Sequence, residues 1–102
     1  MRRNEVWWAE LKSKTRPVLL VSRDSHIKTR DLILAVPLTT RERGLVTQIP
    51  LGPEDGLPKA CVADAGTLLL VHKSQLSRFI VTLSSRKTAD VNAALSYALG
   101  LD

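Results

Sequence analysis

Short apolar runs separated by polar turns make up most of the chain. Residues 5–11 (EVWWAEL) are rich in side chains that favour strands, and residues 17–22 (PVLLVS) are apolar at nearly every position. A continuous apolar run of this length is typical of a strand buried on both faces of a sheet. We therefore expect residues 17–22 to form a central strand. It should begin at Pro17, because proline has no N–H to donate to a neighbouring strand.

The following segments continue this alternation of strands and loops. Residues 32–38 (LILAVPL), 46–51 (VTQIPL) and 78–83 (RFIVTL) are predicted strands. Residues 60–71 predict two short strands or one bulged strand, because Gly66-Thr67 interrupts the apolar run. The segments that are polar or rich in Gly and Pro are predicted loops: residues 12–15, 23–31, 39–44 and 52–59.

The C-terminal segment has the periodicity of an amphipathic helix. Ser84 or Ser85 is suited to cap its start, and Gly100 is suited to end it. Its apolar positions follow the i, i+3, i+4, i+7, i+8 stripe of a helix that packs on one face: Val91, Ala94, Leu95, Ala98 and Leu99. Several strands followed by one helix predict an α+β fold, with a small, strongly curved, barrel-like antiparallel sheet covered by the helix. A chain of 102 residues is expected to form one domain, residues 1–102.

Positive charge is concentrated in one third of the sequence. The formal net charge is +5, and residues 12–43 hold eight Lys or Arg side chains against three acidic ones. The rest of the chain holds seven of each sign and is neutral. Such a basic segment favours contact with the phosphates of nucleic acid.

The cysteine and histidine content and the hydropathy of the chain indicate its compartment and whether it binds a metal. Cys61 is the only cysteine, so no disulfide can form within the chain and a reducing compartment is favoured. No segment has the apolar core of a signal peptide, and the longest apolar stretch, residues 68–71, is too short to cross a bilayer. We therefore expect a cytoplasmic protein with no membrane partner. His26 and His72 stand apart from other ligand residues, so we expect no metal and no cofactor. Each histidine could serve as an acid or base, or lie in a surface loop.

Two predicted strand ends bring polar side chains together. Arg16 directly precedes one strand, and Thr39 and Thr40 directly follow the next. If those strands are antiparallel neighbours, the beginning of one lies beside the end of the other. Four cations of the adjoining loops would join this edge: Lys12, Lys14, Arg41 and Arg43. The edge is either a phosphate-binding site or an ordinary solvated edge whose charges keep the protein soluble.

Six segments, in chain order, resemble the toxins of the MazF/PemK family. Residues 16–22 (RPVLLVS) resemble its RPVLVVS strand, residues 5–11 its EVWWADL strand, and residues 36–40 (VPLTT) its VPLTS or VPCTT segment. The other three matches are to its GLPK, VDKSRL and final helix segments: residues 56–59 (GLPK), 71–76 (VHKSQL) and 95–101 (LSYALGL). The likeness covers nearly the whole chain, and six matches in register make a specific signal.

This resemblance implies a fold, an activity and partners. The fold is a small Src-homology-3-like barrel of the CcdB/MazF/PemK type with a C-terminal helix, working as a homodimer. The activity is metal-independent, sequence-selective cleavage of single-stranded RNA by the toxin of a type II toxin–antitoxin system. The cognate antitoxin neutralises the toxin with an acidic, flexible segment. The catalytic residues would be Arg16 and Thr39, and the RNA-binding residues Lys12, Lys14, Thr40, Arg41, Arg43 and Thr67.

Arginine and threonine suit cleavage by a ribose 2′-hydroxyl that attacks its own phosphodiester. The attack adds negative charge to the phosphoryl oxygens, and the guanidinium of Arg16 offers permanently charged donors to them. A preorganised donor of this kind contributes about 3–4 kcal/mol to transition-state stabilisation. Thr39 can hydrogen-bond a phosphate oxygen or the departing 5′ oxygen. Neither residue is a general base at neutral pH, so the base stays unassigned.

The adjacent Trp7 and Trp8 must point to opposite faces of their strand. One of them is expected in the core. The other is then free to contact RNA or a partner subunit, because single-stranded RNA is commonly bound by stacking of its bases on aromatic side chains.

Three departures from the family pattern keep other functions open. The connector at residues 12–15 is shorter than the glycine-rich loop of many relatives, Gly66-Thr67 replaces an Asp-Gln pair, and Leu69 replaces a basic residue. One alternative is a non-catalytic nucleic-acid-binding barrel. The other is a gyrase-poisoning toxin like CcdB, although this chain ends in LGLD and lacks the aromatic tail of those toxins.

Overall fold

The computed structural model describes residues 1–102 and contains seven strands, two α-helices and two short 3-10 helices. The strands are β1 (Glu5–Leu11), β2 (Lys14–Leu20), β3 (Leu32–Thr39), β4 (Gln48–Leu51), β5 (Cys61–Asp64), β6 (Leu69–His72) and β7 (Leu76–Thr82). The helices are α1 (Asp24–Thr29) and α2 (Ser85–Ala98), and the 3-10 helices are η1 (Pro53–Asp55) and η2 (Lys73–Gln75). The predicted α+β class with a C-terminal helix is confirmed.

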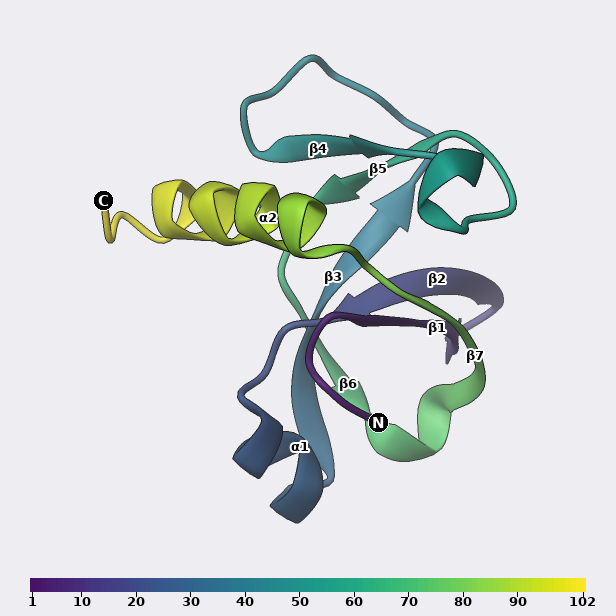
Figure 1. Cartoon of the computed structure of the whole chain (residues 1–102). Helices are drawn as coiled ribbons and strands as arrows, with labels where there is room; N and C mark the ends of the chain where they lie inside the picture. Colours follow the sequence, from purple (N-terminus) through teal and green to yellow (C-terminus); the bar gives the residue numbers. More distant parts are fainter.

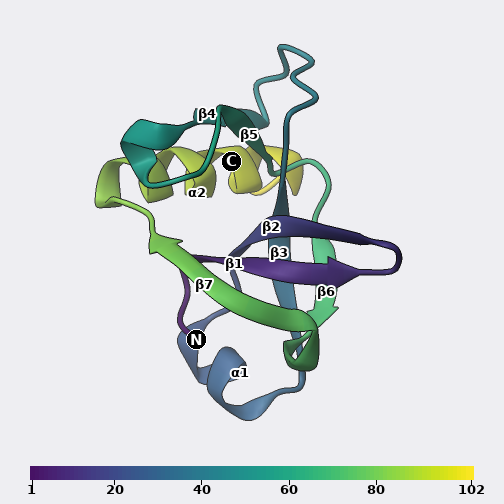
Figure 2. The same cartoon turned by 90° about the vertical axis from the view of Figure 1, so that its right-hand side faces the viewer.

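The strands form one antiparallel sheet in the order β4-β5-β3-β2-β1-β7, with β6 paired to β3. The sheet is strongly curved, and the β4–β5 end lies well away from the β1–β7 end in both views (Figures 1 and 2). Helix α2 lies against the β4–β5 end (Figure 1). The end strands β4 and β7 do not pair, so the predicted barrel-like sheet is open. Neither helix has the length and apolar character needed to span a membrane.

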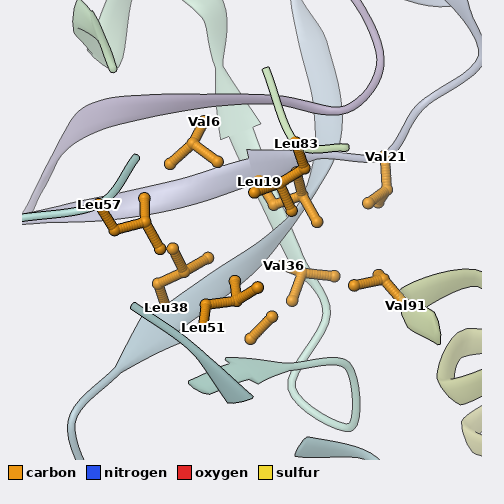
Figure 3. Packing of buried hydrophobic residues seen from close by; sticks show 10 residues of the cluster. Val6, Leu19, Val21, Val36, Leu38, Leu51, Leu57, Leu83 and Val91 are labelled. Carbon is orange, nitrogen blue, oxygen red and sulfur yellow. The ribbon is translucent and has the colours of Figure 1, made fainter. Parts of the chain in front are cut away.

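The second half of strand β2 is buried on both faces, as the continuous apolar run predicted, and residues 35–38 of β3 are buried beside it. Leu19 of β2 and Val36 of β3 belong to a helix-side core that also contains Val91 of α2 (Figure 3). Val18 and Leu20 point the other way, into a second core that contains Ile27 of α1. Because burial on both faces leaves these strands little freedom, their ends are held at fixed positions on which a site can be built.

Two sequence predictions about β2 and the segment after it are wrong. The strand begins at Lys14, so Pro17 lies inside it, opposite Trp8 of β1. The proline is tolerated because β3 pairs with β2 only from Val18 onwards, which leaves Pro17 at a free edge. Residues 23–31 were predicted as a loop, but they contain helix α1. Ile27 is the only buried residue of that helix, so its sequence has no apolar stripe to reveal it.

The interrupted run at residues 60–71 forms two short strands, β5 and β6, as one of the two predicted alternatives. Both pair with β3: Leu38 pairs with Ala63 of β5, and Ala35 pairs with Leu69 of β6. A step of three residues along β3 therefore corresponds to a step of six residues in the partner segment. The additional residues form the turn that contains Gly66 and Thr67. This turn lies beside Pro37 of β3, which has no N–H to offer a partner strand.

Helix α2 has the predicted boundaries. The Ser84 hydroxyl accepts a hydrogen bond from the backbone N–H of Lys87, and Gly100 has a left-handed φ of +69° just after the helix. Val91 and Ala94 are buried, but the last part of the predicted stripe is not, and Leu99 is 56% exposed. The helix therefore extends past the edge of the sheet, and its final apolar residues face outwards.

Candidate active site

The residues at the predicted sheet edge line one pocket. The pairing of β2 with β3 ends at Val18 and Pro37, and beyond that point β3 pairs with β5 instead. The strands separate there, and a pocket of about 440 Å³ lies between them. Arg16 and Thr39 each lie two positions beyond the last β2–β3 pair, and both line this pocket. The expectation that they share one edge is therefore met in the structure.

The pocket is cationic and rich in hydroxyl groups. Three cationic side chains, Lys14, Arg16 and Lys59, line it together with three threonines, Thr15, Thr39 and Thr40. No carboxylate and no imidazole lines it. The remaining lining residues are apolar or weakly polar: Trp8, Pro17, Leu38, Leu57, Pro58 and Cys61. Such a set of donors can bind an anion with several oxygen atoms.

The charges of the pocket are not neutralised within the chain. The structure contains two salt bridges, from the N-terminal ammonium group to Glu5 and from Lys87 to Asp55, and neither involves a pocket residue. Arg16 is a partly buried residue, and its side chain makes no hydrogen bond within the chain. A half-buried cation with no partner favours binding of an anion, because screening by solvent is weaker there than at a fully exposed position.

The Thr39 hydroxyl is oriented by the loop that follows it. Its oxygen accepts a hydrogen bond from the backbone N–H of Arg41, at 3.1 Å. The same loop is held by Gln48, a buried side chain that accepts from the N–H of Arg43 at 2.7 Å and donates to the carbonyl of Arg41 at 3.3 Å. Gln48 was not among the predicted site residues. It positions the segment that carries two of them, Arg41 and Arg43.

The opposite wall of the pocket is the segment from Gly52 to Cys61, which helix α2 anchors. The Lys87 ammonium group donates to the carbonyl of Pro50 at 2.8 Å and lies 3.9 Å from the Asp55 carboxylate. Asp55 also accepts from the N–H of Gly52 at 2.9 Å. Farther along, Leu57 packs next to Leu38 in the helix-side core (Figure 3). These contacts hold the segment from which Lys59 lines the same pocket as Arg16.

Cys61 lies in the pocket as a neutral group. Burial raises the pKa of its thiol above the ordinary value, and the nearby Asp55 carboxylate raises it further, whereas Lys59 acts in the opposite direction. A thiol with a raised pKa is protonated at neutral pH and is a poor nucleophile and base. Cys61 therefore contributes a small, weakly polar surface to the pocket.

The structure gathers some of the predicted site residues in the pocket and leaves others outside it. Lys14, Arg16, Thr39 and Thr40 line the pocket. Arg41 and Arg43 lie on the exposed loop after it, and Lys12 lies in the β1–β2 turn with a left-handed φ of +52°. Thr67 follows the far end of β5, where its hydroxyl donates to Asp64 at 3.1 Å. These four do not line the pocket.

Sequence reasoning did not select Thr15, Lys59 or Cys61, although Lys59 belongs to the GLPK segment. The structure also shows which of the two adjacent tryptophans lies against the core and which reaches the pocket. Trp8 lines the pocket, whereas Trp7 packs against the second core, with its ring edge-on to Phe79 at a centroid distance of 5.9 Å.

The histidines lie elsewhere. His26 is exposed on α1, and the ring of His72 accepts from the backbone N–H of Ser74 at 3.1 Å, which caps η2. Neither lines the pocket. The structure holds no group of three or more His, Cys, Asp or Glu side chains placed to bind a metal ion.

Comparison with known proteins gives a consistent result. A family described as PemK-like, MazF-like toxins of type II toxin–antitoxin systems matches residues 2–99. A relative from Mycobacterium tuberculosis, named probable endoribonuclease MazF2, is 30% identical over 101 residues, which are 98% of this chain and 99% of the relative.

Solved structures agree with the sequence comparison. A mycobacterial endoribonuclease in complex with its cognate antitoxin superimposes with a TM-score of 0.91 at 28% identity, covering 100% of this chain and 97% of that one. A MazE–MazF complex from Deinococcus radiodurans matches with a TM-score of 0.85 over 100% of this chain and 97% of that one. At 20% identity, the second likeness concerns the fold alone.

Proposed function

Because the chain belongs to the family of PemK-like, MazF-like toxins of type II toxin–antitoxin systems, we propose that it is an endoribonuclease that cleaves single-stranded RNA in the Arg16–Thr39 pocket. The observation that carries this proposal is the position of these two residues in one pocket that three cations line and no carboxylate enters. The pocket binds the phosphodiester that is cleaved.

The reaction we propose is an internal transfer of the phosphoryl group. The ribose 2′ oxygen forms a bond to the neighbouring phosphorus, and the bond from phosphorus to the 5′ oxygen of the next nucleotide breaks. The products are a 2′,3′-cyclic phosphate and a free 5′-hydroxyl. The 2′-hydroxyl loses one proton and the departing 5′ oxygen gains one. An intramolecular attack needs no metal-bound water, so we propose a reaction that proceeds without a metal.

The chain's own residues stabilise the charge that develops. The Arg16 guanidinium donates to the non-bridging phosphate oxygens, and Lys14 and Lys59 add positive charge to the same pocket. The Thr39 oxygen already accepts from the Arg41 N–H, so its proton is available for a phosphate oxygen or the departing 5′ oxygen. No lining residue is a carboxylate or an imidazole, and we assign no general base.

The remaining predicted contacts extend this site along the RNA. Thr40 would bind the same phosphate as Lys14, and the exposed Arg41 and Arg43 would meet phosphates farther along the strand. Lys12 would do so from the β1–β2 turn. Thr67, at the far end of β5, would be an outlying contact.

We also propose that the protein is a homodimer neutralised by an antitoxin. An exposed apolar face lies outside the cores, where Leu34 and Leu70 are directly paired on β3 and β6 and are 40% and 61% exposed. Leu99 and Leu101 of the C-terminal segment share a shallow hollow with Leu34. A second copy can bury this face. The antitoxin would use an acidic, flexible segment that competes with RNA for the cationic pocket, and both partners would meet in the cytoplasm.

Cleavage in the presence of EDTA tests the main proposal. Purified wild-type protein should cut a mixed-sequence RNA with EDTA present and leave 2′,3′-cyclic phosphate ends. Arg16→Ala should lower the rate by about 10²–10³-fold, because it removes a charged donor from the transition state.

Arg86→Ala is the matched control for that variant. It removes one arginine from an exposed position near the start of α2, outside the pocket, and should cut like the wild type. Equal rates for Arg16→Ala and Arg86→Ala would contradict the proposed role of Arg16. RNA binding by the wild type without any cleavage would favour a non-catalytic nucleic-acid-binding protein, and poisoning of gyrase without cleavage would favour the CcdB-like alternative.

A further inference from the structure

A second hollow adjoins the active-site pocket. It is lined by Trp8, Thr15, Ser77 and Arg78 and has a volume of about 420 Å³. Trp8 and Thr15 line both hollows, so the two are neighbours. We propose that this second hollow, the Trp8 subsite, binds one nucleobase of the RNA strand whose phosphate lies between Arg16 and Thr39. The inference rests on the proposed RNA substrate and adds the place where a base next to the cleaved phosphate is held.

The sheet register arranges the subsite. Trp8 of β1 lies directly opposite Pro17 of β2 on one side and Arg78 of β7 on the other. Directly paired residues point to the same face of a sheet. Strand β1 lies between β2 and β7 (Figure 2). The indole therefore extends the floor of the active-site pocket across the sheet toward Arg78.

The two tryptophans differ in a way that points to a ligand for Trp8. The indole N–H of Trp7 donates to the Glu5 carboxylate at 2.9 Å, and its ring packs against Phe79. The indole N–H of Trp8 makes no hydrogen bond within the chain, and no buried side-chain nitrogen or oxygen lacks a partner. It follows that the Trp8 N–H is reached by solvent. It can donate to an acceptor on a bound base.

The two neighbouring hollows suit two neighbouring parts of an RNA strand, a phosphate and a base. The first hollow offers cations for a phosphate, and the second is lined by an indole ring and a further cation, Arg78. Stacking on aromatic side chains is the usual means by which proteins hold unpaired bases, and it accepts any base because each has a π-face. A partner made only of charged groups would have nothing to stack on the indole ring.

The β1–β2 hairpin leaves this surface open. Leu11 pairs with Lys14, so the turn consists of Lys12 and Ser13 alone. A turn of two residues cannot fold back over the strands that it joins. A base can therefore reach Trp8 from solvent without displacing any part of the chain.

Tryptophan fluorescence tests the inference directly, because the chain has only two tryptophans. Trp7→Phe leaves Trp8 as the sole reporter and keeps an aromatic ring against Phe79. The probe is a ten-nucleotide 2′-O-methyl RNA, which lacks the hydroxyl that the proposed cleavage needs. We expect the oligonucleotide to quench the emission of Trp8. An oligomer of the same length made of abasic nucleotides should not quench it, and should bind about tenfold more weakly, a difference of about 1.4 kcal/mol.

Trp8→Phe is the matched control, since it leaves Trp7 as the sole tryptophan on the opposite face, and its emission should not change. In steady-state cleavage, Trp8→Ala should raise KM with little change in kcat, and Trp8→Phe should restore most of the loss. Binding without quenching in Trp7→Phe, equal quenching by the abasic oligomer, or no binding of the oligonucleotide would each overturn the inference. Quenching without any RNA cleavage would instead overturn the proposed activity and leave the subsite standing.

Discussion

The hydrogen bond that the Thr39 hydroxyl accepts from the backbone determines how this group can act toward a ligand. Its oxygen accepts from the Arg41 N–H at 3.1 Å. A hydroxyl has one proton to donate and two lone pairs, so this contact uses a lone pair and leaves the proton for an acceptor in the pocket. The group is therefore a hydrogen-bond donor toward RNA, where a phosphate supplies acceptors only.

Substitutions of Thr39 test this donor role. Thr39→Val has nearly the same shape and removes the proton, so we expect cleavage to slow by about 10²-fold. Thr39→Ser keeps the hydroxyl and should retain most of the activity. The two variants are compared by initial rates on one RNA, with thermal unfolding as a check on folding. If Thr39→Val were as active as Thr39→Ser, the hydroxyl would have no part in the reaction.

At the scale of elements, the segment from Gly52 to Cys61 is the part of the site most sensitive to backbone conformation. Gly56 has a φ of +90°, and a Cβ added there would lie 2.7 Å from Cγ2 of Val81 on β7. Val81 is part of a strand and is paired with Val6, so it cannot move away freely. Leu57, Pro58 and Lys59 follow this glycine in the chain and line the pocket.

Gly56→Ala should therefore destabilise the fold and displace the pocket wall. We expect the free energy of unfolding to fall by about 2–4 kcal/mol, as the sum of a left-handed backbone penalty and overpacking. Gly44→Ala is the control, because Gly44 also has a positive φ, +65°, but a Cβ there meets nothing within 4 Å. Urea unfolding measures both. Equal losses would mean that the contact with Val81 has no energetic weight.

The strands could be predicted from the sequence because their signals are local. The continuous apolar run around Leu19 and the periodicity around Val91 led to the correct element and the correct burial. Helix α1 was missed because its burial depends on Ile27 alone. The position of Pro17 inside β2 was missed because it depends on where β3 leaves the sheet, which no local pattern records.

At the scale of the whole molecule, the pocket combines segments that are far apart in the sequence. Arg16 and Thr39 could be expected together from antiparallel pairing alone. Trp8 joins them from β1, which pairs with β2. Lys59 joins them because the curved sheet and helix α2 hold the loop after β4 against the pocket. That arrangement depends on contacts such as Lys87 with Asp55, whose partners lie more than thirty residues apart and carry no shared motif.

The unpaired charge of this assembled surface predicts a steep dependence of RNA binding on salt. Each phosphate contact to a single strand contributes about −0.7 to the slope of log K against log salt. Five contacts, including those of Lys14, Arg16 and Lys59, give a slope of about −3.5, or roughly a hundredfold weaker binding between 50 and 200 mM salt. Fluorescence anisotropy of a labelled 2′-O-methyl oligonucleotide measures the slope.

The same titration distinguishes pocket cations from other surface cations. Lys59→Ala should make the slope shallower by about 0.7, because one contact is lost. Arg86→Ala removes an equal charge outside the pocket and should leave the slope unchanged, although both variants lower the net charge from +5 to +4. A slope that fell equally in both variants would attribute binding to net charge instead of to the pocket. A flat wild-type response would remove the electrostatic basis for an RNA substrate, since single strands bind cationic grooves through released counterions.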